Sequence, residues 1–493
     1  MNVCLLNDSF PPIIDGVANT VMNYARILQE QGFANVTVAT PGYPGVDYSE
    51  YPYRVVPYQS FNTARFANGY RTGNPFDRSE LEELIESKPD IIHSHCPMAS
   101  TIMARLIRAR TGAPLIITYH TKFDIEIARA LKNKTLQDEA IKAMVSNMEA
   151  CDEMWVVSEG AGENLRSLGY TGDYIVMSNG VDFAKGRVDA DTVRQATKDY
   201  DLPEGVPVFL FVGRMLTYKG LPLILDALAL LEKQNFDYRM VFIGGGADAG
   251  AMKEKAEELR LKHCFFTGPI SDRQVLRAWN TRADLFLFPS TYDTNGIVVR
   301  EAAACGLASV LIQGSCAAEG ITHGRNGYLI EETAESMAAL LLEKGNKLDE
   351  LDKVGRCAMD EIYISWDDSV KAAYERYQVI LANREKANAQ EKEGQMGEYN
   401  WALDDHLTDF GEESKTRVEW ALEKMRTPVS KIEDILDEMR CDLDTMLGNA
   451  MQNVDERIEE MHQRYERIMK RRAEAKESVN DPLEEDQKKE EDV

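Results

Sequence analysis

Apolar and polar positions follow two patterns along the first 180 residues, one typical of buried strands and one typical of helices. Short apolar runs are each followed by a polar turn and then by a segment with helical periodicity, most clearly residues 18–31 and 98–111. Strands that alternate with helices in this way build parallel sheets, because each helix carries the chain back to the start of the next strand. The pattern predicts a doubly wound α/β domain over residues 1–182. Its expected strands are NVCLL, NVTVAT, YRVVPY, DIIHSH, LIITYH, EMWVVS and YIVMSNG.

The same alternation begins again after a looser, polar stretch. Residues 183–205 end in DLPEGVP and have the composition of a linker. A second doubly wound domain is predicted over residues 183–364. Because open parallel sheets bind ligands at the carboxyl ends of their strands, tandem domains predict a cleft between the two sheets. The expected strands of the second domain are VFLFVGR, RMVFIGGG, CFFTGP, LFLFPS and ASVLIQG.

The composition changes from Trp401 onward. Apolar residues there recur in alternating steps of four and three, which is the seam of a coiled coil. Thr427 and Pro428 match an N-cap and a first helical residue, so a new helix is expected to begin there. We predict a helical extension over residues 385–476 that forms a homo-oligomer; a hairpin folded back on the chain's own body is the alternative. Residues 477–493 are acidic and expected to be disordered. The seam begins with Val418, Leu422, Met425, Val429, Ile432, Leu436, Met439 and Leu443.

Composition and charge narrow the classes of function. The 493 residues are 44% hydrophobic and carry a formal net charge of -26, more than half of it in residues 385–493. Nucleic acid is therefore not expected as a partner, because its binding needs a basic surface. Eight cysteines without a CxxC pair predict a reduced, cytoplasmic chain. No run approaches the roughly 18 apolar residues of a membrane span, and the N-terminus resembles a buried strand rather than a signal peptide.

The stretch FVGRMLTYKG carries two cations after a predicted strand. Arg214 follows the strand directly, and Lys219 lies near the start of the next helix. Two cations beside a helix N-terminus make a site for a diphosphate. The alternative is a pair of solvated charges at an ordinary turn.

The stretch PSTYDTNGIVVREAAACG favours the diphosphate. Asn295 and Gly296 lie where a helix should begin, so free backbone N–H groups are expected to face the cleft and bind phosphate oxygens. Asp293 precedes this helix and Glu301 lies about one turn into it, a spacing that allows one carboxylate to meet a sugar and the other a ribose. Acids that favour a helix N-terminus are the alternative for each. The expected N–H donors are those of Gly296, Ile297 and Val298.

Smaller features of both domains point to the same cleft. Gly16 lies between the first strand and its helix and can let the backbone approach a ligand. The glycine turn IGGGAD at 243–248 lacks the full GxGxxG pattern of a dinucleotide site. His93 and His95 can share one face of a strand, but a third metal ligand is not apparent, so packing and cleft lining are expected and a metal site is not. His120, also at a strand end, is either structural or a hydrogen-bonding group for the ligand.

In order and spacing, these motifs resemble those of the family 4 glycosyltransferases. The resemblance covers roughly residues 1–384 and rests on DSFPPIIDGVANTV, IIHSHCP, TYHT, SNGVD, FVGRMLTYKG, FTGPISD and PSTYDTNGIVVREAAACG. It implies the GT-B fold, in which two tandem Rossmann-like domains enclose the cleft, and a helix at residues 365–384 that crosses back to the first domain. It further implies transfer of a hexose from a nucleotide-sugar, with UDP-hexose as the expected donor, with retention of configuration and with no metal or other cofactor.

The resemblance also assigns roles to individual residues. Arg214 and Lys219 would neutralise the leaving diphosphate, while Glu301 would hold the ribose. The sugar and phosphate would be bound by Asp293 together with Asn295 and Gly296, and the first domain would complete the site. His120 and Gly16 are the residues expected to do so. One departure stands out: the family's usual first acid is Glu, whereas Asp293 is one methylene shorter.

The motifs YHTKFD and STYDTNG are similar to those of bacterial diacylglycerol glucosyltransferases. This similarity implies a lipid acceptor, with a glycan as the other class, and peripheral contact with the inner face of the membrane. A basic patch in the first domain would support that contact. Two other functions stay open: a sugar-nucleotide 2-epimerase of the same fold, and an inactive sugar-nucleotide-binding scaffold for the helical extension. The patch comprises Arg105, Arg108, Arg110, Lys122, Arg129, Lys132 and Lys134.

Overall fold

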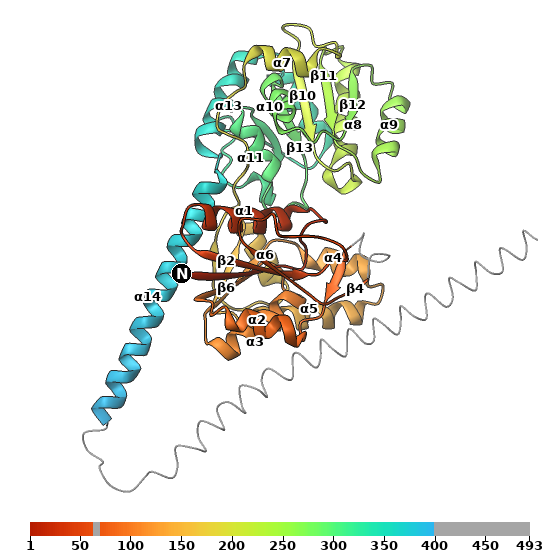
Figure 1. The fold of residues 1–493 in the computed structure, drawn as a ribbon. Coiled ribbons are helices and arrows are strands. Elements are labelled where there is room, and N and C mark those ends of the chain that lie inside the picture. Colours follow the sequence, from red (N-terminus) through yellow and green to blue (C-terminus); the bar gives the residue numbers. More distant parts are fainter. Residues whose placement is uncertain (63–69, 399–493) are drawn as a thin grey trace, which may run out of the picture. The chain divides into compact units, whose positions relative to one another are not determined.

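The computed structural model describes residues 1–62 and 70–398, with the side chains of residues 129, 130 and 387–398 left out. The predicted heptad seam and the acidic tail lie outside these residues. Within the described part, two separate parallel sheets form the centres of two α/β domains (Figure 1). The fold is the tandem α/β architecture expected from the alternating pattern.

The first sheet has seven parallel strands in the order β3-β2-β1-β6-β7-β8-β9. Its central strands are buried along their whole length, as expected for a sheet with helices on both faces. The order reverses between β1 and β6, so the carboxyl ends of these two strands form the switch point. The strands are β1 (Asn2–Leu6), β2 (Asn35–Pro41), β3 (Arg54–Tyr58), β6 (Ile91–Ser94), β7 (Leu115–Tyr119), β8 (Glu153–Val156) and β9 (Tyr174–Val176).

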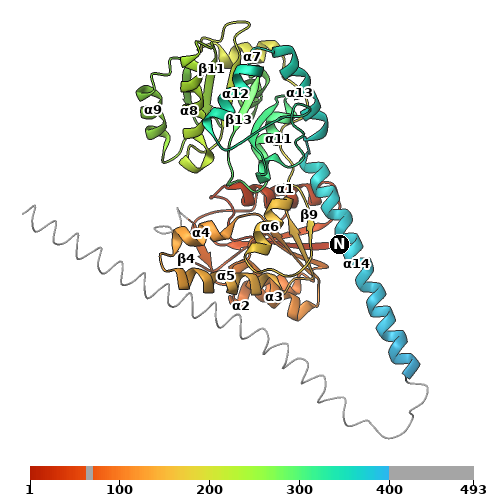
Figure 2. The same cartoon turned by 180° about the vertical axis from the view of Figure 1, so that it is seen from behind.

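Helices connect these strands. Asp15 caps the first of them, α1 (Gly16–Glu30), by accepting hydrogen bonds from the backbone N–H groups of Val17 and Ala18. Figure 2 shows α6 beside β9 at one edge of the sheet. A short antiparallel pair, β4 (Ser60–Asn62) and β5 (Arg71–Gly73), lies between β3 and α2. The remaining helices are α2 (Arg78–Glu86), α3 (Ala99–Thr111), α4 (Phe123–Ala130), α5 (Lys134–Met148) and α6 (Glu159–Ser167).

The second sheet has six parallel strands in the order β12-β11-β10-β13-β14-β15, with its switch point between β10 and β13. The pattern of the sequence predicted all of them except the three-residue β15. The strands are β10 (Val208–Val212), β11 (Arg239–Ile243), β12 (Cys264–Gly268), β13 (Leu285–Phe288), β14 (Ser309–Ile312) and β15 (Tyr328–Ile330). The helical segments are η1 (Thr217–Lys219), α8 (Leu221–Lys233), α9 (Ala249–Glu258), α10 (Arg273–Arg282), α11 (Ile297–Ala304), η2 (Cys316–Ala318), α12 (Ala334–Lys344) and α13 (Leu348–Glu361).

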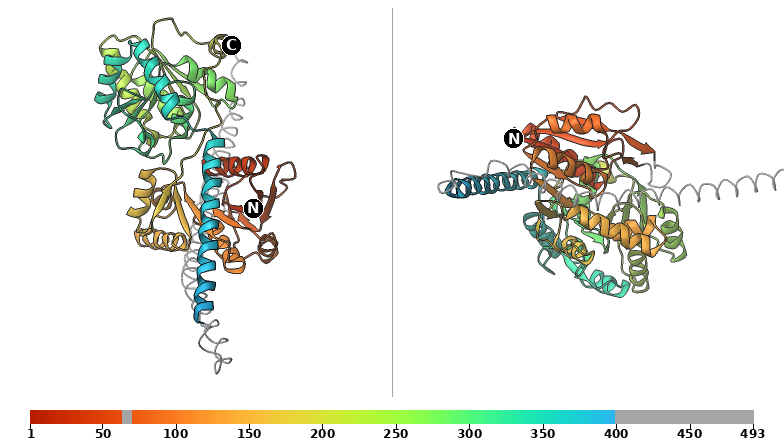
Figure 3. Two further views of the ribbon diagram at one scale, coloured as in Figure 1. Left: turned by 90° about the vertical axis from the view of Figure 1, so that its left-hand side faces the viewer. Right: turned by 90° about the horizontal axis from the view of Figure 1, so that it is seen from below.

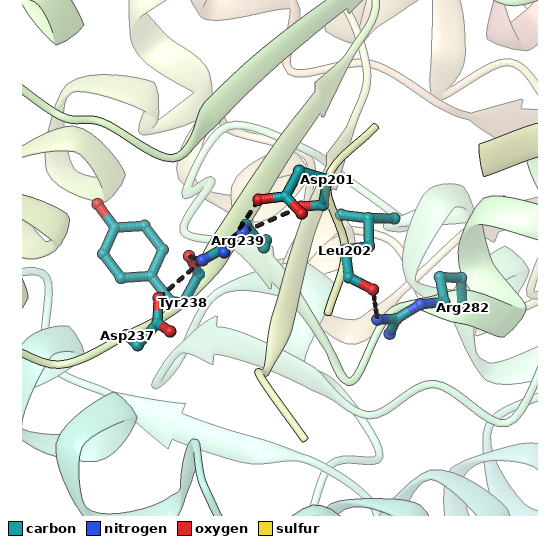
Figure 4. Close-up of polar contacts among 6 residues, drawn as sticks. All are labelled: Asp201, Leu202, Asp237, Tyr238, Arg239 and Arg282. Carbon is teal, nitrogen blue, oxygen red and sulfur yellow. Dashed lines mark hydrogen bonds and ion pairs between the residues drawn. The ribbon is translucent and has the colours of Figure 1, made fainter. Parts of the chain in front are cut away.

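The stretch expected to be a plain linker differs from that expectation. Residues 183–205 contain the helix α7 (Ala190–Thr197), which is capped by Asp189 and packs against α10. Further along, Arg239 at the start of β11 donates to the carbonyl oxygen of Asp201 at 2.9 Å and to the carboxylate of Asp237 at 2.7 Å (Figure 4). Arg282 donates to the carbonyl oxygen of Leu202 at 3.3 Å. The end of the linker is thereby fixed at the amino edge of the second sheet, opposite the edge where ligands bind.

One helix returns from the second domain to the first. Figure 3 shows α14 (Trp366–Glu398) as one uninterrupted helix. Its buried face belongs to the same hydrophobic core as α1 and the first sheet. Arg376 on this helix donates three hydrogen bonds, of 2.5, 2.9 and 3.0 Å, to the carboxylate of Glu153 of β8. The core residues of α14 are Trp366, Val370, Ala373 and Tyr377.

Candidate active site

The predicted site residues lie at the carboxyl ends of strands in both sheets. Arg214 and Lys219 follow β10, and Asp293 follows β13, so they surround the switch point of the second sheet. In the first domain, Gly16 follows β1 and His120 follows β7. The topology therefore brings residues that are up to 285 positions apart in the sequence, from Gly16 to Glu301, to the carboxyl edges of the two sheets.

The loop that carries Arg214 is held in place by the glycine turn after β11. Gly244 has φ 142°, and a Cβ atom there would lie 1.9 Å from the carbonyl oxygen of Gly213. Asp248 accepts hydrogen bonds from the N–H and the hydroxyl of Thr217, at 2.7 and 2.8 Å. Arg214 is exposed and makes no ion pair with any described residue. Packing of this loop thus explains the glycine turn after β11. It also leaves the guanidinium of Arg214 without an ion pair to a described residue at the switch point.

Lys219 is buried and already has a carboxylate partner. Its ammonium group forms an ion pair with Asp293, whose other oxygen accepts a 2.5 Å hydrogen bond from Ser290. Gly220, with φ 79°, allows this close approach, because a Cβ atom there would lie 2.3 Å from the carbonyl oxygen of Pro289. The side chain of Asp293 therefore lies against the cation expected to bind the diphosphate, in addition to any contact with a sugar.

Helix α11 begins as the sequence predicted. Gly296 is its N-cap, and the N–H groups of Ile297 and Val298 have no partner within the helix. Asn295 is buried, and its amide nitrogen donates to the carbonyl oxygen of Val157 in the first domain at 2.5 Å. Its side-chain oxygen is buried without a partner among the described residues. Asn295 thus joins the helix start to the first domain and leaves one acceptor unused.

Glu301 is paired with a residue that the sequence gave no reason to select. Its Oε1 accepts a 2.7 Å hydrogen bond from Arg273 at the start of α10. Arg273 also approaches Asp182 at 3.3 Å, and its guanidinium lies 4.4 Å from the centre of the Phe183 ring. Burial raises the pKa of Glu301, and the charge of Arg273 opposes that rise. Arg273 lies 28 positions before Glu301, in FTGPISDRQV, where no periodicity or spacing marks it.

Three buried histidines form a chain at the carboxyl edge of the first sheet. The ring nitrogens of His93 are hydrogen-bonded to Tyr377 of α14 at 2.6 Å and to Thr118 at 2.7 Å. His95 Nδ1 is 3.0 Å from His120 Nε2, and the His93 and His95 rings are 4.0 Å apart. Burial lowers the pKa of His120 to about 3, and lowers the pKa values of His93 and His95 as well. His120 Nδ1 makes no hydrogen bond to a described residue and so remains for a ligand.

Gly16 is the first residue of α1. A Cβ atom built on it would meet no protein atom within 4 Å, so no contact within the described chain requires a glycine there. The open space leaves the backbone accessible to a ligand. As for metals, the described residues contain no group of three or more His, Cys, Asp or Glu side chains that could hold an ion.

Hydrogen bonds connect the loop before α11 to the first domain. Thr294 donates to the carbonyl oxygen of His120 at 2.6 Å, and its own carbonyl oxygen accepts from Ser158 at 2.5 Å. Lys122 donates to the carbonyl oxygen of Thr291 at 3.0 Å. His120 and Asp293 therefore lie on segments that are bonded to each other.

A cavity of about 520 Å³ opens beside this loop. Tyr218 and Tyr292, the neighbours of Lys219 and Asp293 in the sequence, line it with ring centres 4.5 Å apart. Apolar side chains form much of the remaining wall, and among the described residues no lysine or arginine lines it. The other lining residues are Ile125, Thr217, Gly220, Pro222, Leu223, Pro289, Thr291 and Glu332.

The expected basic patch of the first domain is not a free cationic surface, and this prediction is wrong for most of its members. Arg105 is buried and bonded to Asn147. Ion pairs with acidic residues neutralise Arg108, Arg110 and Lys134. The sequence could not show this, because two of the three acidic partners come from other helices or loops. In the described part of the chain, no helix is long and apolar enough to cross a bilayer.

Two tandem parallel α/β domains with a site at their carboxyl edges define the GT-B class of proteins. Residues 14–185 match the sequence model described as Glycosyltransferase Family 4, and residues 193–355 match the model described as Glycosyl transferases group 1. The two matches together span more than half of the chain. The chain belongs to the family 4 glycosyltransferases, and it is a glycosyltransferase.

Curated relatives are identical to this chain at about a quarter of the aligned positions. The alpha-monoglucosyldiacylglycerol synthase of Streptococcus pneumoniae is 24% identical over 314 residues, which cover 62% of this chain and 70% of that protein. The sulfoquinovosyl transferase SQD2 of Arabidopsis thaliana is 25% identical over 369 residues, covering 71% and 67%. The D-inositol 3-phosphate glycosyltransferase of Pseudarthrobacter chlorophenolicus is 25% identical over 323 residues, covering 61% and 74%.

Solved structures share the fold. Anabaena HepE in complex with UDP and glucose superimposes with a TM-score of 0.60 at 15% identity, covering 76% of this chain and 99% of that one. The sucrose-phosphate synthase of Thermosynechococcus elongatus gives a TM-score of 0.61 at 18% identity, covering 78% and 99%. At these identities the likeness establishes the architecture of the described domains.

Proposed function

We propose that the protein transfers a hexose from a nucleotide-sugar, with UDP-hexose as the first candidate, to a lipid hydroxyl with retention of configuration. The observation that carries the proposal is the grouping of Arg214, Lys219, the start of α11 and Glu301 around the carboxyl edge of the second sheet. Cations and free N–H groups suit a diphosphate, and a buried carboxylate suits ribose hydroxyls. The complex of HepE with UDP and glucose supports UDP-hexose as the donor.

In the proposed reaction, the acceptor oxygen attacks the anomeric carbon on the face from which the diphosphate leaves. The bond between that carbon and the phosphate oxygen breaks, and the leaving phosphate takes the proton of the acceptor hydroxyl. Negative charge grows on the diphosphate, so Arg214, Lys219 and the N–H groups at the start of α11 stabilise the transition state more than the bound donor. The reaction uses no metal and no other cofactor.

A lipid acceptor is supported by two observations. The relatives include a synthase named for monoglucosyldiacylglycerol. Four of the six exposed large hydrophobic residues among those described also lie on segments that follow β1, β3 or β6, at the carboxyl edge of the first sheet. Exposed apolar side chains gathered at one edge can enter a bilayer without the basic patch. These four are Ile14, Phe61, Phe76 and Met98, of which Ile14 is 65% and Phe61 57% exposed.

The donor is tested with purified protein. A thermal-shift series with UDP, GDP, ADP and their hexose conjugates should give a rise in melting temperature with one base, because a ligand that binds only the folded state stabilises it. That donor is then incubated with diacylglycerol vesicles. A glycolipid with retained configuration is the expected product. A 2-epimerised sugar nucleotide, or no turnover in a folded protein, would instead support the epimerase or the scaffold.

Membrane contact is tested by vesicle flotation. The wild-type chain should float with diacylglycerol-containing vesicles, and the paired substitution Ile14→Ser and Phe61→Ser should weaken flotation and activity on vesicles. Leu342→Ser, an exposed apolar position on α12 of the second domain, is the matched control. Activity on detergent-dispersed acceptor should be retained in all variants. Flotation equal in both variants would show that these two side chains do not contact the bilayer.

A further inference from the structure

The carboxylate of Glu301 is enclosed, and among the described residues one cation, Arg273, lies beside it. The Glu301 side chain is 12% exposed, and the only hydrogen bond to it from a described residue comes from Arg273. That bond engages Oε1 at 2.7 Å, whereas Oε2 has no partner in the described part of the chain. Arg273 is fixed in turn from two other directions, by Asp182 and by the Phe183 ring. Two adjacent residues of one segment thus hold the guanidinium against one oxygen of Glu301.

The two oxygens of the Glu301 carboxylate have different surroundings and can therefore bind different partners. A carboxylate accepts hydrogen bonds through both oxygens when it is ionised, and each ribose hydroxyl needs an acceptor. With Oε1 bonded to Arg273, the carboxylate plane is fixed and Oε2 is directed to the ligand. An enclosed carboxylate without a counterion would tend to take up a proton and lose part of this acceptor capacity.

We propose that Arg273 is a positioning residue for nucleotide binding, which orients the Glu301 carboxylate and keeps it ionised for the ribose hydroxyls. The inference rests on the proposed function, since it assumes that Glu301 meets a ribose. Arg273 itself acts through Glu301.

The surroundings of Glu301 set the direction of the pH dependence. Arg273 from α10 is the cation that faces it, and Asp182, from the segment after β9, is the nearest acid. At the C-cap of its own helix, Cys305 is a further titratable neighbour, and burial raises the pKa of that thiol to about 11. Removing the charge of Arg273 leaves Asp182 and burial, which both raise the pKa of Glu301. Protonation of Glu301 should then begin at a higher pH than in the wild type.

The experiment compares wild type with Arg273→Gln and Arg273→Lys by calorimetric titration of the nucleoside diphosphate that the thermal-shift series selects, between pH 6 and pH 9. For Arg273→Gln we expect affinity to fall by about tenfold at pH 6, because Glu301 is then partly protonated and accepts hydrogen bonds from the ribose less strongly, and by less at pH 9. Arg273→Lys keeps the charge and should follow the wild-type profile. The 2′,3′-dideoxy form of the same nucleotide lacks the ribose hydroxyls, so its affinity should not differ between wild type and Arg273→Gln.

The possible results distinguish failure of the proposed role of Arg273 from failure of the proposed function. A flat ratio of affinities across the pH range, or an equal loss for the ribose and dideoxy ligands, would overturn the role of Arg273 while leaving nucleotide binding intact. If wild type binds no nucleoside diphosphate, the proposed function is wrong and this role is wrong with it.

A second measurement needs no ligand and also detects a folding defect. Arg273→Gln should lower the melting temperature more at pH 8 than at pH 6, since Glu301 is ionised and unpaired at the higher pH. In a Glu301→Gln background the same substitution should show no such pH dependence. The same difference between pH 8 and pH 6 in both backgrounds would refute the coupling of these two residues.

Discussion

Lys219→Ala separates the proposed catalytic role of the lysine from its structural one. In the wild-type site, the Lys219 side chain is 11% exposed and Asp293, its partner, is 22% exposed. Removing the lysine leaves Asp293 with the Ser290 hydroxyl and some solvent. Because the carboxylate is not fully buried, we expect a loss of about 1–2 kcal/mol in the free energy of unfolding, below the range for a fully buried pair. The fold should survive.

The effect on turnover should be much larger. If Lys219 stabilises charge on the leaving diphosphate, its loss should lower kcat by about 100- to 1,000-fold, the range for one preorganised donor to a developing anion. Steady-state kinetics with the identified donor, beside urea unfolding, measures both quantities. Lys255→Ala is the matched control: its 2.8 Å pair with Asp226 joins α9 to α8, so stability should change by about 0.2–1 kcal/mol and turnover should not change.

The double variant Lys219→Ala, Asp293→Asn completes the design. Asn at position 293 removes the unpaired charge, so most of the lost stability should return while turnover stays low. Recovery of turnover in the double variant, or near-normal turnover in Lys219→Ala, would show that Lys219 only neutralises Asp293. The diphosphate-binding role would then be refuted.

Other substitutions and conditions test the scaffold around the site. Burial holds the pKa values of the three histidines below that of a free imidazole, so they are neutral in the fold but bind protons when the chain unfolds. The free energy of unfolding should therefore fall as the pH is lowered from about 6.5 towards 3. Each histidine adds a slope of about 1.4 kcal/mol per pH unit, which unfolding curves at several pH values measure. Gly244→Ala should cost about 2–4 kcal/mol by chemical unfolding, because its Cβ atom would overlap a carbonyl oxygen. Gly16→Ala, in open space, should stay within about 1 kcal/mol. Tyr377→Phe should cost about 1–3 kcal/mol by the same measurement, since it leaves one ring nitrogen of His93 unpaired.

The sequence predicted those elements whose cause is local. Strand β7 is a continuous apolar run that is buried along its length, and α1 shows a helical apolar period with Asp15 in front of it. Helix α7 was missed, because it is short and polar and is held by packing against α10, which a single segment cannot reveal. The strands β4, β5 and β15 were also missed, and each has only three residues.

The same distinction between local and long-range causes holds for the residues of the candidate site. The order of strands and helices places residues at carboxyl edges, and this is why the sequence, together with the family resemblance, could single out Arg214, Lys219 and Glu301 as candidates. Their partners could not, since an ion pair depends on which side chains the fold brings together. Arg273 approaches Glu301 across two neighbouring helices, and Tyr377 reaches His93 from 284 positions away. No pattern within one segment encodes such a contact.

The charges of the site explain what a diphosphate would change. Of the cations near the second sheet's switch point, Lys219 and Arg273 are already paired with acids, and Arg214 has no ion pair with a described residue. A diphosphate that binds Lys219 must share it with Asp293 or displace that carboxylate. In the proposed reaction, Asp293, one methylene shorter than the family's usual Glu, would then exchange a cation for sugar hydroxyls when the donor binds. Asp293→Glu should therefore change sugar selectivity and donor affinity together, because the longer side chain alters both contacts, and competition between UDP-glucose and UDP-galactose measures the first.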